Sequence, residues 1–208
     1  MNSGLLLKVN CVSLCHFKDA NYTSSPRLML PSLHKRFTAL ENARAQLLKE
    51  LEHLHESQLA FKSAPEAWSI LEVVEHLILV ERASLSYLHK KRSGLVSLKK
   101  LGRVDSAWRC FLLACALRSP LKFKAPAKSV LPNSGQSLHE LRTEWEELRQ
   151  QWRTTLESIT PDMMRFPLSG HPVAGRFTAA QGLFWIAEHL RHHLKQIARI
   201  QKASRHSS

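Results

Sequence analysis

Three segments of the chain begin with the same helix-start signature, a hydroxyl residue followed three positions later by glutamate or glutamine. They start at Ser69, Ser137 and Thr178. In this capping box, each of the two side chains accepts a hydrogen bond from a backbone N–H that the first helical turn leaves free. Apolar residues then recur at alternating steps of three and four, and the same period runs without a box from about Ser32 to Glu56. The pattern predicts four long amphipathic helices, and therefore an all-α four-helix bundle.

The size of the chain fits one such bundle. Its 208 residues are 44% hydrophobic and 23% charged, with only seven glycines, which is the balance of a single helical globular domain. We expect this domain to span residues 32–203 and to be followed by a short tail, 204–208. Residues 1–31 have no apolar period and are expected to form a loosely ordered extension, within which Met29 is an alternative start of translation.

The spacing of the cysteines and the hydropathy of the chain indicate in which cellular compartment the protein is expected. None of the four cysteines forms a Cys-x-x-Cys pair, and they lie in two unrelated segments: Cys11, Cys15, Cys110 and Cys115. This arrangement predicts reduced thiols in a cytoplasmic protein rather than a disulfide framework or a zinc knuckle. The chain also lacks a run of about 18 uncharged apolar residues, so we predict no transmembrane helix.

The long connection between the second and third helices carries most of the positive charge. Residues 89–138 contain eleven lysines and arginines against a single acid, Asp105, in a chain of net charge +13. A short apolar helix, expected from Ser106 to Leu117 with Trp108 on it, interrupts the basic residues. The segment is either a solvated basic connection or attracts an acidic substrate, nucleic acid or an anionic membrane surface. We expect the other two, shorter connections to join antiparallel neighbours, whereas this long one allows a crossover.

Histidines of the last and second helices are candidate metal ligands. His189 and His193 are four residues apart, so their imidazoles lie one above the other on the same helical face. His76, in the middle of the second helix, is the candidate for a third ligand. His192 points about 100° away around the helix and is expected to be a surface neighbour. His171, in the loop before the last helix, is a candidate proton shuttle, although a turn-stabilising role is favoured.

Three motifs make the chain resemble the DinB/YfiT-like family of four-helix bundles. They are the segments 67–77 (Ala-Trp-Ser-Ile-Leu-Glu-Val-Val-Glu-His-Leu), 171–178 (His-Pro-Val-Ala-Gly-Arg-Phe-Thr) and 188–197 (Glu-His-Leu-Arg-His-His-Leu-Lys-Gln-Ile). The resemblance covers about residues 33–203 and implies a site in which His76, His189 and His193 hold a divalent metal ion, zinc or nickel. It also implies a homodimer. Some members of the family are thiol-dependent transferases or isomerases and others are hydrolase-like.

These features lead to one main functional hypothesis and two alternatives. The main one is a metal-dependent transferase or hydrolase that acts on a small substrate, either anionic or a low-molecular-weight thiol. One alternative is a non-catalytic metal-binding or interaction module whose apolar helix docks on a membrane or a partner. The other is a basic stress protein that binds nucleic acid, which is disfavoured because few aromatic residues interleave the basic ones.

Overall fold

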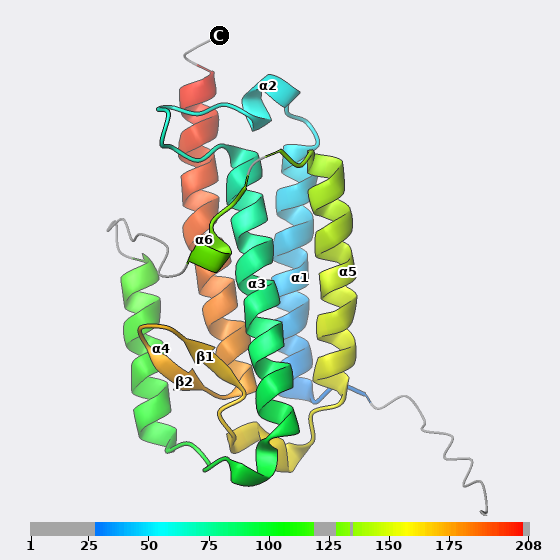
Figure 1. Ribbon diagram of the computed structural model, residues 1–208, viewed down its shortest axis with the longest axis vertical. Coiled ribbons are helices and arrows are strands. Elements are labelled where there is room, and N and C mark those ends of the chain that lie inside the picture. Colours follow the sequence, from blue (N-terminus) through cyan, green and yellow to red (C-terminus); the bar gives the residue numbers. More distant parts are fainter. Residues whose placement is uncertain (1–27, 119–127, 134, 206–208) are drawn as a thin grey trace, which may run out of the picture.

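Four long helices form a bundle, as the sequence predicts (Figure 1). The structure is a computed structural model that describes residues 28–118, 128–133 and 135–205, with Arg103 and Lys128 described by their backbone alone. The bundle consists of α1 (Pro31–Leu51), α3 (Ile70–Ser93), α5 (Leu138–Glu157) and α6 (Ala179–Ser204). The predicted extension, residues 1–31, and tail, residues 204–208, fall largely outside the described residues. Within the described part, Met29 is buried and packs against the core.

The three predicted capping boxes are present and begin α3, α5 and α6. In the first, the Glu72 backbone N–H donates to Ser69 Oγ at 3.2 Å, and the Ser69 N–H donates to the Glu72 carboxylate at 2.7 Å. Ser137 and Thr178 make the same reciprocal pair. Each box is fixed by residues three apart, so these starting points could be predicted without any knowledge of the tertiary fold.

The helix directions show why the second connection is long. In Figure 1, α1 and α6 run upward along the chain, whereas α3 and α5 run downward. Among the four long helices, the closest packing is between α3 and α5 and between α1 and α6, which are parallel pairs. The prediction that the shorter connections join close antiparallel neighbours is therefore wrong, because α1 and α3, although antiparallel, each pack mainly against another helix. Since α3 and α5 are parallel, the chain must return along the whole bundle between them.

Smaller elements lie at the ends and along one side of the bundle. They are α2 (Glu56–Leu59), the 3-10 turns η1 (Leu95–Ser97), η2 (Lys128–Val130) and η3 (Pro161–Arg165), the helix α4 (Arg103–Arg118), and the strands β1 (Ser169–His171) and β2 (Gly175–Phe177). The first helix ends at Leu51, five residues earlier than predicted, and α2 follows it. The apolar helix starts at Arg103, three residues earlier than predicted, and Asp105 lies in its first turn. The expected turn-rich loop contains an antiparallel hairpin, β1–β2, beside α4 and α6.

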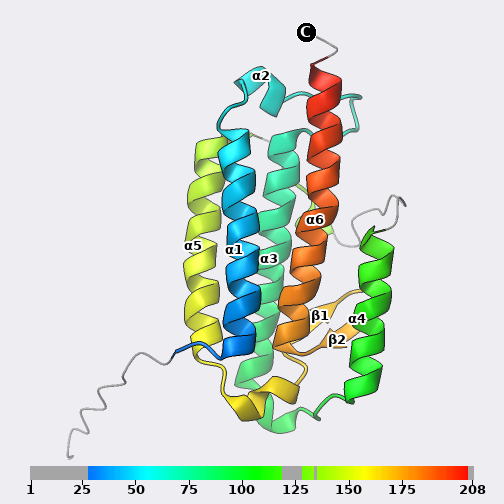
Figure 2. The ribbon, with the colours of Figure 1, turned by 180° about the vertical axis from the view of Figure 1, so that it is seen from behind.

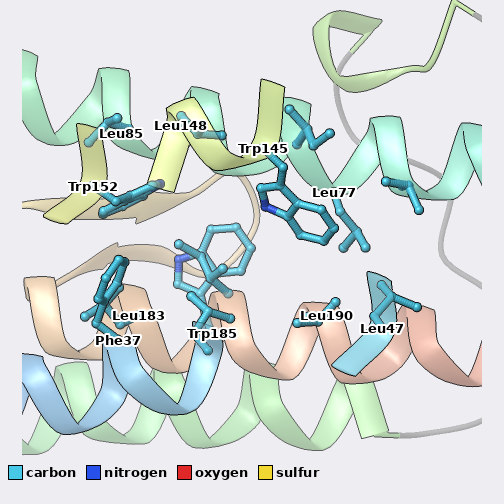
Figure 3. Packing of buried hydrophobic residues seen from close by; sticks show 14 of the residues in the cluster. Phe37, Leu47, Leu77, Leu85, Trp145, Leu148, Trp152, Leu183, Trp185 and Leu190 are labelled. Carbon is cyan, nitrogen blue, oxygen red and sulfur yellow. The ribbon is translucent and has the colours of Figure 1, made fainter. Parts of the chain in front are cut away.

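The core lies between the four long helices. Side chains of α3 and α5, including Trp145 and Trp152, face those of α1 and α6, including Phe37 and Leu190 (Figure 3). These residues belong to the apolar stripes predicted from the sequence. Their burial provides most of the stabilisation of the fold, at about 1.5–3 kcal/mol for each large side chain removed from water.

A charged group lies inside this core and was not predicted. Arg149 of α5 and Glu81 of α3 are both almost inaccessible, and the Arg149 Nη2–H donates to Glu81 Oε1 at 2.6 Å. Burial raises the pKa of Glu81, and the charge of Arg149 opposes that rise. The guanidinium Nε of Arg149 also lies 3.3 Å from Glu41 on α1. The pair therefore ties the parallel helices α3 and α5 together and faces α1.

Two further sequence predictions concern membranes and cysteines. Among the described residues, no helix is both long and apolar enough to cross a membrane. Cys110 is buried and Cys115 is exposed, both as free thiols on α4. Cys11 and Cys15 lie outside the described residues.

Candidate metal centre

Three histidines from two helices meet in the interior near the middle of the bundle. His189 and His193 lie one turn apart on α6, and His76 faces them from α3. The Nε2 atoms of His76 and His189 are 3.4 Å apart, and those of His193 and His189 are 3.1 Å apart. One nitrogen of each ring lies within 4.8 Å of the other two. In the part of the chain that the structure describes, no other three His, Cys, Asp or Glu side chains have this geometry.

The opposite ring nitrogens hold two of these imidazoles in one orientation. The His76 Nδ1–H donates to the Val130 carbonyl oxygen at 2.7 Å, and the His193 Nδ1–H donates to the side-chain oxygen of Gln196 at 2.9 Å. A proton on Nδ1 leaves Nε2 of the neutral ring as a bare acceptor. Val130 and Gln196 thus turn two lone pairs toward the same point. Outer partners of this kind usually orient metal-binding histidines.

The surroundings keep all three imidazoles neutral. Burial lowers the pKa of His76, against a smaller opposing effect of the Val130 hydrogen bond. Burial, with the neighbouring imidazoles adding to it, lowers the pKa of His189 well below its usual value. The pKa of His193 falls to about 3, chiefly because the ring is buried. Neutral imidazole is the form that binds a metal ion, so the triad is in its ligating form at neutral pH.

The nitrogen separations fit a divalent ion. Tetrahedral ligands at a zinc–nitrogen distance of about 2.0–2.1 Å lie about 3.3 Å from one another. The two measured separations, 3.4 and 3.1 Å, bracket that value. A set of three imidazoles leaves a fourth position open, as in catalytic zinc sites. The donor set and its spacing therefore suit zinc, nickel or a similar ion.

Aromatic side chains line the triad. The Trp68 ring lies 4.9 Å from that of His76, between ring centres, and the Trp185 ring lies 5.9 Å from that of His189. The hairpin lies close to α6 here because residue 182 is glycine. A Cβ atom at Gly182 would lie 2.5 Å from Ser169 Oγ, and this hydroxyl also accepts a hydrogen bond from Trp185 Nε1 at 3.3 Å. One side of the site is thus built by the hairpin.

His171 lies on that hairpin and makes the turn contacts expected of it. Its Nδ1 accepts hydrogen bonds from the backbone N–H groups of Val173, at 3.3 Å, and Ala174, at 3.2 Å. Its ring packs edge-on against Trp185, with the ring centres 5.3 Å apart, and burial lowers its pKa. His171 therefore stabilises the β-turn and contacts Trp185, which in turn contacts His189. Its other nitrogen, Nε2, is the atom that a proton shuttle would use.

His192 is not the simple surface residue that the sequence suggests. It is half-buried, and its Nδ1–H donates to the Leu117 carbonyl oxygen at 2.8 Å. One residue further along α4, the Arg118 guanidinium forms two hydrogen bonds, of 2.7 and 2.8 Å, with the buried carboxylate of Glu188. Residues flanking the triad on α6 therefore fasten the end of α4. Helical spacing correctly placed His192 on a different face of α6 from His189 and His193. It could not predict that α4 covers His192.

The far end of the basic connection is fastened to α3. Val130 holds His76, and the Asn133 backbone N–H donates to the Glu75 carboxylate at 3.0 Å. No sequence pattern pointed to Val130, because its contribution is a main-chain carbonyl. Gln196 could have been found, since it lies three residues after His193 on the same helical face.

The chain belongs to the DinB superfamily, to which residues 39–197 match. The matched residues include most of the bundle, the triad and α4. A relative in Bacillus subtilis (strain 168), the uncharacterized protein YuaE, is 26% identical over 160 residues, which represent 77% of this chain and 93% of that protein.

Proposed function

We propose that this protein binds a divalent metal ion, zinc or nickel, through His76, His189 and His193, and is a metal-dependent transferase or hydrolase. Its substrate would be a small anionic or thiol-bearing molecule. One observation carries the proposal: three neutral imidazoles direct Nε2 atoms toward one point, with separations of 3.1 and 3.4 Å. Two of these rings, His76 and His193, are held with their protons on the outer nitrogen, so each presents a bare Nε2 to that point.

The residues of the site would divide the work as follows. His76, His189 and His193 hold the ion, while Val130 and Gln196 keep the first and last of them in the ligating tautomer. A divalent ion with an open position acidifies a bound water or binds a thiol as thiolate. Trp68 and Trp185 lie against the ligand rings and would keep bulk water away, which strengthens electrostatic interactions at the ion.

The charge of the basic connection supports an anionic substrate. The eleven lysines and arginines of residues 89–138 would raise the local concentration of anions. This connection is fastened beside the triad at two places: its residues 117 and 118 contact His192 and Glu188 on α6, and its residues 130 and 133 contact His76 and Glu75 on α3.

The test is metal loading followed by a search for turnover. Untagged protein is stripped with chelator, titrated with zinc or nickel, and analysed for metal by mass spectrometry and for affinity by calorimetry. The loaded protein is then assayed with thiols plus electrophiles, and with ester and amide substrates, beside a His189→Ala control. Tight one-to-one binding with turnover that His189→Ala lacks is expected. Absence of metal binding would refute the proposal, and binding without turnover would favour the non-catalytic metal module.

A further inference from the structure

Helix α4 packs on the bundle by one face only. Cys110, Leu113, Ala114 and Leu117 are buried against the rest of the protein, chiefly α6 and the strand β2. In Figure 1, α4 stands at the flank of the bundle, and Figure 2 shows from behind that α6 separates it from α1. The opposite face of α4 is therefore turned away from the protein.

That outer face is apolar. Val104, Trp108, Phe111 and Leu112 are spaced by four, three and one residues, so they share one side of the helix. Their exposed fractions are 84%, 59%, 56% and 49%. The Trp108 and Phe111 rings stack with centres 5.6 Å apart and, with Val104 and Ala107, line a shallow groove. A contiguous exposed patch of this kind typically marks an interaction surface.

The segment that carries this patch is positively charged. Lys99 and Lys100, just before α4, are exposed, and the whole connection has eleven basic residues against one acid. That acid, Asp105, is paired with Arg109 one turn along the helix. The partner of this surface should therefore combine an apolar interior with a negatively charged boundary.

We propose that the outer face of α4 docks on the surface of an anionic lipid bilayer. Trp108, Phe111 and Leu112 would enter the boundary between headgroups and acyl chains, while Lys99 and Lys100 would contact anionic headgroups. Nucleic acid fits less well, because this face is aliphatic and aromatic, while Lys99 and Lys100 precede the helix. A second copy of this chain would bring two sets of like charges together.

The position of α4 makes such docking directional. Its last turn is held by the Arg118–Glu188 pair and by the hydrogen bond between Leu117 and His192. The helix is thus fixed to the bundle along its buried face, and docking would lay the bundle with α4 against the bilayer. This role requires neither a bound metal nor catalysis.

The test is vesicle flotation of the full-length protein. One set of vesicles is phosphatidylcholine alone, and the other contains equal parts of phosphatidylcholine and phosphatidylglycerol. We expect binding to the second set, weakened by salt, and much weaker binding to the first. The double variant Trp108→Ser/Phe111→Ser should bind the anionic vesicles about tenfold more weakly or worse, with an unchanged melting temperature because both side chains are exposed.

Matched controls distinguish binding through this face of α4 from non-specific hydrophobic binding and from an effect of net charge. Leu28→Ser removes an exposed apolar side chain just before α1, outside α4, and should leave binding unchanged. Lys99→Gln/Lys100→Gln should weaken binding about tenfold, whereas Lys35→Gln/Lys49→Gln, with the same change in net charge on α1, should have less effect. Equal effects in test and control variants, or no vesicle binding, would overturn the proposal. So would a dimer, or an oligonucleotide complex, that the α4 variant abolishes while vesicles remain unbound.

Discussion

The Nδ1–H of His76 donates a 2.7 Å hydrogen bond to the carbonyl oxygen of Val130, 54 residues further along the chain. Through this contact, a main-chain carbonyl of η2 fixes the tautomer of a candidate metal ligand. It also fastens the end of the basic connection onto α3, beside the triad. The orientation of the site and the course of the connection are therefore decided together.

The metal triad makes the first prediction. His76→Ala, His189→Ala and His193→Ala should each lower metal affinity by more than about 100-fold, since losing an outer partner alone costs about 10–100-fold. His192→Ala should keep the metal, because its ring contacts Leu117 instead. Metal content of the four variants, measured by mass spectrometry, is the test. If His76→Ala kept its full metal content, the three-histidine site would be refuted, even if both α6 histidines proved essential.

Gln196 provides a second prediction that addresses orientation rather than ligation. Gln196→Ala removes the acceptor of the His193 Nδ1–H, so the ring can turn and affinity for zinc or nickel should fall about 10–100-fold. Gln201→Ala, on the same helix, serves as the control and should retain the original affinity. Competition titration against a chromophoric chelator measures both. Equal affinities of the two variants would mean that Gln196 does not position the ligand.

Stability of the metal-free protein should depend on pH through the triad. The pKa of His193 is about 3 in the folded protein against 6.5 ordinarily, and burial also lowers the pKa of His76 and His189. Below pH 6.5 the unfolded chain therefore binds more protons than the folded one, so the free energy of unfolding falls as the pH falls. Urea unfolding from neutral pH to about pH 5 should show this slope, at most about 1.4 kcal/mol per pH unit for each histidine.

A substitution isolates the contribution of one ring to that slope. His193→Gln keeps a polar side chain but removes the titrating group, so the fall in stability on acidification should be shallower. His34→Gln changes an exposed histidine on α1 and should leave the slope as it is. An unchanged slope in His193→Gln would show that this imidazole is protonated in the folded state as readily as in the unfolded state.

The buried pair in the core leads to a prediction about stability. Glu81→Ala leaves the Arg149 guanidinium inside the bundle without its 2.6 Å partner, and should cost about 3–5 kcal/mol. Glu52→Ala removes one partner of the exposed pair with Arg142 and should cost less than about 1 kcal/mol. Chemical denaturation compares them. If Glu81→Ala also carries Arg149→Leu, much of the stability should return, because no unpaired charge is then buried.

Truncation tests the predicted boundary of the domain. Residues 1–28 lack the apolar period, whereas Met29 packs on the core and α1 begins at Pro31. A chain that starts at Met29 should keep its helical content, with a melting temperature within about 1–2 °C of the full chain. A drop of about 4 °C or more, equivalent to ~1 kcal/mol or more at this size, would show that the removed residues stabilise the bundle.

Local sequence determined most of the secondary structure and the helical faces. Ser69, Ser137 and Thr178 start helices because a capping box involves only residues three apart. The apolar stripes predicted which side of each helix is buried, and helical spacing placed His189 and His193 together on one face of α6. His76 was the candidate third ligand from its place in the second helix, and the family resemblance points to the same residue. The capping boxes, the apolar stripes and the spacing of His189 and His193 each involve residues only a few positions apart, so the sequence alone is enough to recognise them.

Tertiary structure alone decided how the helices are paired and what surrounds each histidine. The period of a helix gives its buried face but neither its neighbour nor its direction, so the parallel packing of α3 on α5 could not be predicted. For the same reason the pairing of Arg149 with Glu81 inside the core could not be predicted. His76 is oriented by a main-chain carbonyl 54 residues away, and His192 is covered by α4. A contact between residues far apart in sequence depends on the relative position of two elements, which only the packed core fixes.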